Sequence, residues 1–563
     1  MNERVRLLLR AARKPDVGFL LALFLLALAL RCLRTGLMEF KHDEAAGWLM
    51  AHGLRAGIHF PSTGLFSSKG VENFPLFIYI LTAFQTVFRR PDMVVWPIAF
   101  LNSLAILPIF SATRKLFDRR TAWLTCIMYS FAPASVFFSR KIWAQDMLPF
   151  WASVMFWLTV GLMEGDREKR SGPRRFLLGF MAVTAFQIHL SSLFLLPAFL
   201  VIVCLYRERF RPFLPLCLGI LGGLIPAIPY FVHVIPKLDE VAGILHEEVG
   251  GGLRFRLKEL VLFFVRQTSD EGLPALLGPD YHRFLSSVPM YNLLRHVLSA
   301  LVVAGAGICA ARIVRGGERQ RRAGVLLLVL MGVPLALLAL SRIALFPSYF
   351  LIFCPLPFLL AALAVVTGAE ILARPIHPAA MRLVLIGCAA FLLIGHLAYH
   401  VQFLRLIKEH GGTRGDYGIC FAETLRAARW LKERRVSPGS LRPEDLPLSV
   451  ALLTLDENQE RGKGEQERGK DEPGHSSERP ASQHQDSQSS GFLLVNRLVY
   501  PVLDAESAQW LLEESKAYYL LEPPLGRLGE LQVRYPAQVL TSRQAAEARD
   551  LLKVAVRLSS RER

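Results

Sequence analysis

Apolar runs of roughly twenty residues recur along the first 400 or so positions of this chain, and they restrict its fold more than any other feature. One such run, folded as an α-helix, is long enough to cross the hydrocarbon core of a bilayer, about 30 Å. Of the 563 residues, 52% are hydrophobic, and the mean hydropathy is +0.35. A soluble chain of this length would normally divide into several separate cores. We therefore expect a polytopic α-helical membrane protein.

The apolar runs predict about eleven transmembrane helices. We place them at residues 17–33, 96–116, 121–137, 148–163, 176–189, 192–206, 213–231, 297–314, 323–340, 346–366 and 382–402. The apolar segment 74–88 is short and opens at Pro75, so we expect it to lie along the membrane interface. The first run has no small-residue cleavage site after it, which favours a retained helix over a signal peptide.

Positive charge predicts the orientation of these spans. The short loops on the side of the N-terminus are rich in Arg and Lys, whereas those on the other side carry little beyond Arg140, Lys141 and Arg342. This asymmetry indicates a cytoplasmic N-terminus, with the chain after residue 402 outside a plasma membrane. The net charge of +18 then reflects basic loops that face anionic lipid. No nucleic-acid-binding motif is present, so we expect no nucleic-acid partner.

We predict two domains. Residues 1–403 form a transmembrane module with long outer segments at 34–95 and 232–296. Residues 404–563 form a small extracytoplasmic α/β domain. Within it, AETLRAARWLKERR indicates an amphipathic helix and LSVALLTL a strand, and GFLLVNRLVY, AESAQWLLEESK and AYYLLEPP indicate strand, helix and strand. Residues 456–490 lack apolar side chains and are expected to be a disordered insertion.

The first outer segment carries an acidic pair, Asp43 and Glu44, just before the expected helix AAGWLMAHGL. Acids in the first turn of a helix offset its dipole and cap its free N–H groups. A carboxylate at a membrane mouth could equally serve as a general base. The residues alone leave both interpretations open.

A second charged group stands between the third and fourth spans, in SRKIWAQDMLPF. It contains Arg140, Lys141 and Asp146. Trp143 and the basic residues suit an interfacial anchor. However, the predicted topology puts Asp146 on the same membrane face as Asp43, which is consistent with a shared site.

Further candidates lie at the ends of later spans on this face. His189 stands where the fifth and sixth spans meet, and Arg342 and Tyr349 lie at the start of the tenth. His189 could be a hydrogen-bonded residue within the helix bundle, and Arg342 could be an anchor. As a functional residue, Arg342 could hold a phosphate, because a guanidinium binds phosphate through two parallel hydrogen bonds.

Together these motifs resemble the membrane glycosyltransferases of the C-type fold, in particular the protein O-mannosyltransferases and the bacterial aminoarabinose transferase of lipid A. The resemblance covers roughly residues 15–400 and, more weakly, 405–435. The motifs that carry it are Asp43-Glu44, Asn73-Phe74-Pro75-Leu76, Ser139-Arg140 followed by Asp146, Pro347-x-Tyr349 followed by Leu356-Pro357, and GDYG at 415–418.

The resemblance implies an activity. Such enzymes pass a sugar from a polyprenyl-phosphate donor to a lipid, polysaccharide or protein acceptor on the outer face, without a nucleotide. It implies Asp43 as the base that accepts the acceptor's proton, with Asp146 supporting the site. The aminoarabinose transferases have a lysine where Asn73 and Phe74 stand here, and Lys69 is a candidate replacement. The leaving phosphate needs cations, with Arg140, Lys141, Arg342 and Lys69 as candidates.

Three other classes of protein remain as alternatives. A transporter or flippase would carry charged residues near the bilayer midplane and often inverted repeats, and neither pattern is evident. A sensor or scaffold would use its outer domain to bind a partner. An oligosaccharyltransferase or polymerase of the same fold would use a divalent metal. The acids of this chain are well separated along the sequence, so we predict no metal and no cofactor.

Overall fold

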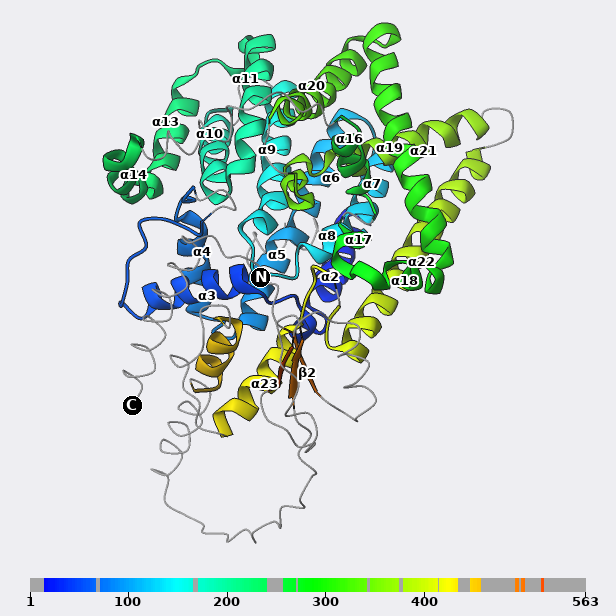
Figure 1. Ribbon diagram of the computed structural model, residues 1–563. Coiled ribbons are helices and arrows are strands. Elements are labelled where there is room, and N and C mark those ends of the chain that lie inside the picture. Colours follow the sequence, from blue (N-terminus) through cyan, green and yellow to red (C-terminus); the bar gives the residue numbers. More distant parts are fainter. Residues whose placement is uncertain are drawn as a thin grey trace, which may run out of the picture.

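The computed structural model consists almost entirely of α-helices (Figure 1). It describes residues 15–66, 71–165, 171–239, 257–269, 272–341, 345–373, 378–413, 415–433, 446–456, 492–495, 498–501 and 518–520.

Every apolar run that predicts a span coincides with helical structure. The first half contains α2 (Pro15–Cys32), α5 (Pro91–Leu104), α6 (Ile106–Leu116), α7 (Arg119–Phe131), α8 (Pro133–Phe137), η2 (Ala144–Met147), α9 (Leu148–Met163), α10 (Ser171–Ile188), η3 (Leu190–Phe194), α11 (Leu195–Leu205), α12 (Arg207–Phe210), α13 (Leu214–Leu224), η4 (Ile225–Ala227), α14 (Ile228–Val234) and η5 (Ile235–Lys237). The second half contains α19 (Pro289–Arg315), α20 (Glu318–Leu340), η7 (Pro347–Phe353), α21 (Leu356–Ala373) and α22 (Pro378–His410).

Several of these helices can cross a bilayer. In the described part of the chain, six are long and apolar enough to do so, and a seventh span results if η7 and α21 are taken together across their 63° bend. The chain therefore has the character of a polytopic membrane protein. The count of eleven spans stays a prediction, because several apolar runs form shorter helices, such as α7 followed by α8, and η3 continuing into α11.

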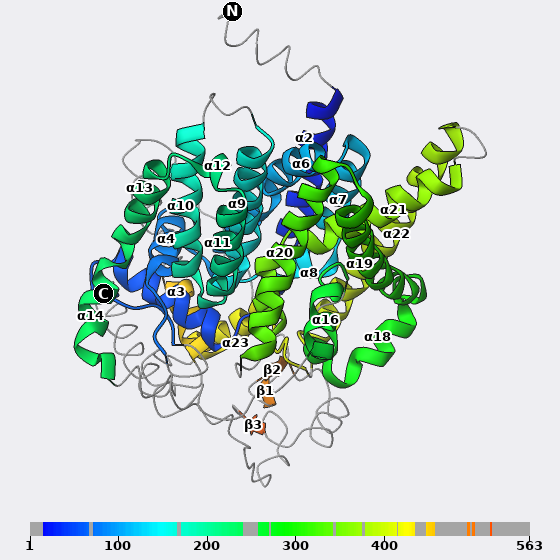
Figure 2. The ribbon, with the colours of Figure 1, turned by 90° about the horizontal axis from the view of Figure 1, so that it is seen from above.

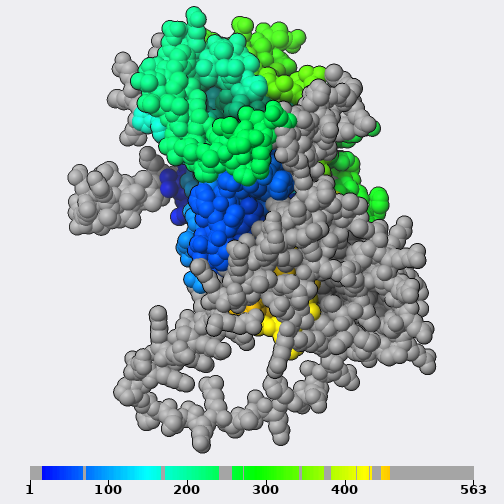
Figure 3. Space-filling view, turned by 60° about the vertical axis from the view of Figure 1, so that its left-hand side comes forward, coloured from blue at the N-terminus to red at the C-terminus, as the bar shows by residue number. Residues whose placement is uncertain are grey.

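The outer segment 34–95 contains η1 (Thr35–Leu37) and two longer helices, α3 (His42–Arg55) and α4 (Leu76–Gln85). The ten residues of α4 rise about 15 Å, half of a bilayer core, so α4 cannot cross it. This length agrees with the interfacial position that the sequence predicts. α3 and α4 pack together beside α10 (Figures 1 and 2), and their blue surface adjoins the green surface of α13 and α14 (Figure 3).

The second outer segment, 232–296, also contains helices in its described part. They are α16 (Leu257–Arg266), α17 (Leu273–Leu277), η6 (Gly278–Asp280) and α18 (Tyr281–Ser287). α19 begins at Pro289, earlier than the predicted start at residue 297. The amphipathic α16 buries Leu260 and Phe264 against α19 and η7, which ties this segment to the helix bundle.

After α22 the chain forms α23 (Phe421–Glu433), which confirms the predicted amphipathic helix. The strand predicted at LSVALLTL is wrong, because residues 446–456 form a helix. A short apolar run suits either structure, and here its leucines and alanines, which are good helix formers, are buried around the whole helix. Both segments predicted as strands contain strands, in a sheet of order β2-β1-β3 (β1 Phe492–Val495, β2 Leu498–Pro501, β3 Tyr518–Leu520), but GFLLVNRLVY forms two antiparallel strands, β1 and β2, instead of the predicted one. The predicted helix at 505–516 and residues 457–490 lie outside the described residues.

Buried polar bonds fix the connection between α7 and α9, which carries the second charged group. The guanidinium of Arg31, at the end of α2, donates to the carbonyl oxygens of Tyr129 (3.2 Å) and Ser130 (2.9 Å), where α7 ends. It also donates to the hydroxyls of Ser135 (2.7 Å) and Ser139 (3.1 Å). The last carbonyls of a helix lack partners within the helix. Arg31 therefore satisfies them within the bundle and holds residues 129–139 against α2.

Candidate functional site

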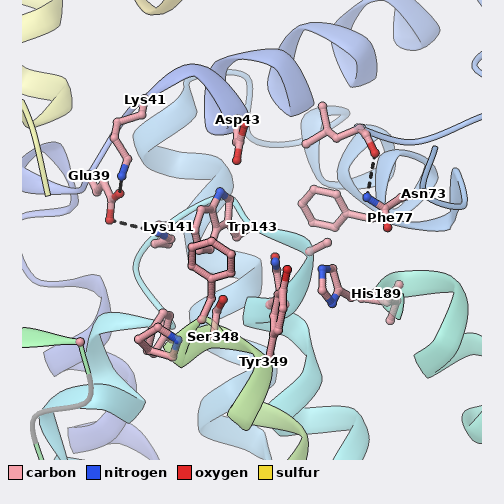
Figure 4. A pocket seen from close by; sticks show the side chains of 18 of the residues that line it. Glu39, Lys41, Asp43, Asn73, Phe77, Lys141, Trp143, His189, Ser348 and Tyr349 are labelled. Carbon is pink, nitrogen blue, oxygen red and sulfur yellow. Dashed lines mark hydrogen bonds and ion pairs between the residues drawn. The ribbon is translucent and has the colours of Figure 1, made fainter. Parts of the chain in front are cut away.

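A pocket of about 400 Å³ lies beside the start of α3. Its wall comes from stretches far apart in the sequence, at 39–43, 64–66, 73–77, 137–145, 188–189, 272–276 and 346–349, together with Asp416. Much of the wall is aromatic. Glu39, Lys41 and Lys141 lie at one end, and Asn73 and His189 at the other (Figure 4). The pocket thus combines charged groups with an apolar surface that could receive a sugar or a lipid chain.

The two acids of the Asp43-Glu44 pair have different environments in the structure. Glu44 is fully buried, and its Oε2 accepts a hydrogen bond from the backbone N–H of Lys41 at 3.0 Å, so Glu44 caps α3. Asp43 instead lines the pocket, and its side chain points into it (Figure 4). The capping interpretation therefore holds for Glu44, while Asp43 stands where a substrate could reach it.

A third acid, Glu39, joins two lysines at one end of this pocket. Its Oε2 lies 3.0 Å from Lys141 Nζ, and its Oε1 forms an ion pair with Lys41 Nζ. Burial alone would raise the pKa of Glu39, but Lys141 and Lys41 together outweigh burial and hold that pKa below its usual value. Glu39 is therefore a carboxylate, and it binds both ammonium groups at once.

Lys141 is enclosed by groups that stabilise its charge. Besides Glu39, its Nζ lies 3.5 Å from Glu44 Oε1 and 3.3 Å from the centre of the Trp143 ring. Burial raises the pKa of Glu44 to about 7, with Lys141 opposing the shift and the nearby charge of Glu39 adding to it. Glu44 therefore titrates near neutral pH.

Arg140, next to Lys141 in the sequence, has a different position. Its guanidinium donates to the carbonyl oxygens of Leu30 (3.0 Å), Arg31 (3.2 Å) and Arg34 (3.2 Å). These carbonyls lie at and just beyond the end of α2, where a positive charge also offsets the helix dipole. Arg140 does not line the pocket, and its described bonds tie the chain after α8 to the end of α2.

Asp146 is fully buried and does not line the pocket. Its backbone oxygen accepts a hydrogen bond from Asn102 Nδ2 at 2.7 Å, while neither carboxylate oxygen has a hydrogen-bond partner within the described structure. Electrostatic interactions link its carboxylate to Lys141, Glu44 and Glu39. The structure thus brings Asp146 near the acid–lysine cluster, without placing it in the pocket wall.

His189 and Tyr349 line the opposite part of the pocket, with ring centres 5.4 Å apart (Figure 4). The Nδ1 of His189 accepts a hydrogen bond from the backbone N–H of Ser191 at 3.2 Å. In a neutral imidazole this bond places the ring hydrogen on Nε2, which is then a donor. The other two predicted cations, Lys69 and Arg342, lie outside the described residues.

Segment 37–41, just before α3, is positioned by residues that follow the last long helix. The N–H of Phe421 donates to Met38 O at 3.0 Å, Glu39 forms a β-bridge with Cys420, and Lys41 Nζ donates to Asp416 O at 2.5 Å. The backbone N–H of Asp416 in turn donates to Ala275 O at 2.7 Å. Asp416 therefore reaches the pocket from the GDYG motif.

That motif requires its first glycine. A Cβ at Gly415 would lie 2.4 Å from Ala275 O and from the backbone nitrogen of Gly278, so only glycine allows this approach.

Sequence reasoning missed Glu39, Lys41 and Trp143 as lining residues, and it noted Asp416 only within GDYG. A signal for the first two was present, because EFKHDE places four charged residues within six positions. No group of three or more His, Cys, Asp or Glu side chains in the described ranges is arranged to hold a metal ion. The metal-free site stays a prediction.

Comparison with known families identifies one matching segment. Residues 72–233 match the family described as dolichyl-phosphate-mannose-protein mannosyltransferase, which is less than a third of the chain. The predicted resemblance to protein O-mannosyltransferases is confirmed by this match. Asp43 and Glu44 precede the segment, while Asn73, Lys141 and His189 lie within it and line the pocket. No curated protein matches the chain in sequence.

Solved structures of two membrane enzymes are similar to the chain. The Archaeoglobus fulgidus oligosaccharyltransferase tethered to an acceptor peptide has 15% identity and a TM-score of 0.46, over 78% of this chain and 59% of that one. ArnT from Cupriavidus metallidurans bound to undecaprenyl phosphate has 14% identity and a TM-score of 0.48, over 77% of this chain and 84% of that one. The chain thus spans less than two thirds of the oligosaccharyltransferase.

Proposed function

We propose that this protein is a glycosyltransferase that moves a sugar from a polyprenyl-phosphate donor to an acceptor at the extracytoplasmic face. The observation that carries the proposal is the shared pocket. Asp43 lines it together with Asn73, Lys141 and His189, which belong to the segment that matches the mannosyltransferase family. The name of that family supplies the donor class, a sugar on a polyprenyl-type phosphate, and protein as one acceptor class.

In the proposed reaction Asp43 is the general base. An acceptor hydroxyl attacks the anomeric carbon, Asp43 takes the hydroxyl proton, and the bond from that carbon to the phosphate oxygen breaks. Polyprenyl phosphate leaves with the bonding electron pair, and the configuration at the sugar is inverted. A well-placed base contributes about 10²- to 10⁴-fold in rate, on the order of 3–5 kcal/mol. The capping bond of Glu44 favours Asp43, which lines the pocket, over Glu44 for this role.

The proposal extends to the arrangement in the membrane. The prenyl chain would lie among the apolar helices, and the sugar would lie against the aromatic wall of the pocket. We retain a cytoplasmic N-terminus and an extracytoplasmic domain at 404–563, because the charge asymmetry of the loops supports this orientation. We also retain about eleven spans and a reaction without a metal ion as parts of the proposal.

The test is transfer by the purified protein. Polyprenyl-phosphate-linked mannose, glucose, galactose and arabinose would be offered with lipid, polysaccharide and peptide acceptors, and release of polyprenyl phosphate would be measured. We expect one donor to be consumed, and Asp43→Asn to abolish its consumption. Asp92→Asn, at the start of α5 and paired with Arg90, is the matched control and should remain active. An Asp43→Asn variant with wild-type turnover would remove Asp43 from the mechanism.

The same preparation distinguishes a transporter. Reconstituted vesicles that move a labelled lipid-linked sugar across the bilayer without releasing polyprenyl phosphate would support the flippase alternative and contradict sugar transfer.

A further inference from the structure

The leaving phosphate of the proposed reaction must be stabilised by a cation, so the charged groups near the pocket can be compared as candidates. Three cationic side chains of the described structure lie at or beside its charged end, namely Lys41, Arg140 and Lys141. They differ in how exposed they are to the pocket and in the partners that already surround them. That difference indicates which of them can accept a new anionic ligand.

Two of the three are poorly accessible from the pocket. Arg140 is bonded to three backbone carbonyls at the end of α2 and does not line the pocket. Lys141 is 3% exposed and is enclosed by Glu39, Glu44 and the Trp143 ring. The Lys141 ammonium donates a hydrogen bond to Glu39 Oε2, and it also faces Glu44 Oε1 and the Trp143 ring. Because so little of this side chain is exposed, a phosphate in the pocket has less access to Lys141 than to a more exposed cation.

Lys41 differs on each point. Its side chain is 38% exposed and lines the pocket. Its described partners are the Glu39 carboxylate and the backbone oxygen of Asp416, at 2.5 Å, which leaves one of three donors for a ligand. Lys41 also stands two residues before Asp43, at the N-terminus of α3, where the helix dipole favours an anion. In Figure 4 Asp43 lies between Lys41 on one side and Asn73 on the other.

We propose that Lys41 binds the phosphate of the polyprenyl donor and stabilises its negative charge as the sugar leaves, an inference that rests on the proposed function. Glu39 holds the ammonium in place through one donor, Asp416 O through a second, and the phosphate takes the third. Because Glu39 stays bonded to Lys141, its carboxylate remains compensated whether or not the phosphate is present. The segment after the last long helix thereby contributes to donor binding through Asp416.

The experiment measures binding of polyprenyl monophosphate, without a sugar, to the full-length protein in nanodiscs of neutral phosphatidylcholine. We expect Lys41→Met to weaken binding at least ten-fold and Lys41→Arg to stay within about three-fold of the wild type, because arginine retains the charge. Lys258→Met removes an exposed lysine of α16 that does not line the pocket, and should have no effect. Wild-type affinity in Lys41→Met would overturn the assignment, as would loss of binding in Lys41→Arg with retained thermal stability.

Two competition experiments distinguish polyprenyl monophosphate from other phosphate-containing ligands that Lys41 could bind. Excess inorganic phosphate and phosphatidylglycerol are added as competitors, and neither should displace polyprenyl monophosphate. Displacement by phosphatidylglycerol would show that Lys41 holds a phospholipid headgroup and would overturn the assignment. Lys41-dependent binding without any sugar transfer would support this inference while contradicting the proposed function, so the two fail separately. A wild-type protein that does not bind polyprenyl monophosphate would overturn the inference.

Discussion

The ammonium group of Lys141 lies 3.0 Å from Glu39 Oε2, and the two side chains are 3% and 1% exposed, respectively. Removing one partner of a buried ion pair leaves the other charge without compensation. Because Glu39 keeps its ion pair with Lys41, Lys141→Met should lower the free energy of unfolding by less than the full cost of about 3–5 kcal/mol for an uncompensated buried charge. Adding Glu39→Gln removes the carboxylate that has lost one of its two ammonium partners, so the double variant should recover part of this loss. Thermal unfolding of the detergent-solubilised protein measures both, and a double variant no more stable than Lys141→Met would contradict the pairing.

Arg140 should behave as a structural residue. Arg140→Met removes the hydrogen bonds to Leu30 O, Arg31 O and Arg34 O, of which Arg34 O keeps a second donor in the Leu37 N–H, and each buried group left unpaired costs about 1–3 kcal/mol. We expect a clear fall in the apparent Tm and a KM for the donor within about two-fold of the wild type, measured at a temperature where the variant is folded. A large rise in KM with an unchanged Tm would instead show that Arg140 binds the phosphate.

Asp146→Asn should separate activity from stability. The carboxyl group of Asp146 is buried and neither of its oxygens has a hydrogen-bond partner in the described structure, so an amide of the same size breaks no described side-chain bond. We expect an apparent Tm close to that of the wild type, together with a turnover at least ten-fold lower if Asp146 supports the site.

A second aspartate provides the matched control for this variant. Asp118 caps α7 by accepting from the backbone N–H groups of Arg120 and Thr121, so Asp118→Asn should keep full turnover. Unchanged turnover in Asp146→Asn would exclude that residue from the reaction.

Glu44 should make stability depend on pH near neutrality. Burial raises the pKa of Glu44 from 4.5 to about 7, so the folded protein holds this proton more tightly than the unfolded chain does. The contribution to stability is therefore present below about pH 4.5 and is lost as the pH rises through about 7. The Tm of the wild type minus that of Glu44→Gln should fall between pH 5 and pH 8. A difference that is flat or rises over this range would contradict a raised pKa.

The sequence alone determined the helical, membrane-spanning character of the chain. Apolar runs of bilayer length can satisfy their backbone groups in lipid only as helices, and the structure has helices at every predicted run. The sequence also indicated Asp43, Lys141, His189 and Tyr349 as site candidates, and all four line one pocket. The errors arose where local pattern is ambiguous, as at LSVALLTL, which forms a helix.

Only the tertiary structure distinguished neighbours that the sequence presents as equivalent. Asp43 and Glu44 are adjacent in the first turn of α3, yet Asp43 lines the pocket, whereas Glu44 is buried and caps the helix. Arg140 and Lys141 are also adjacent, yet one binds the end of α2 and the other the Glu39 carboxylate. The roles of Arg140 and Lys141 depend on partners about a hundred residues away in the chain. Local sequence cannot specify such contacts, because they form only when distant helices pack together.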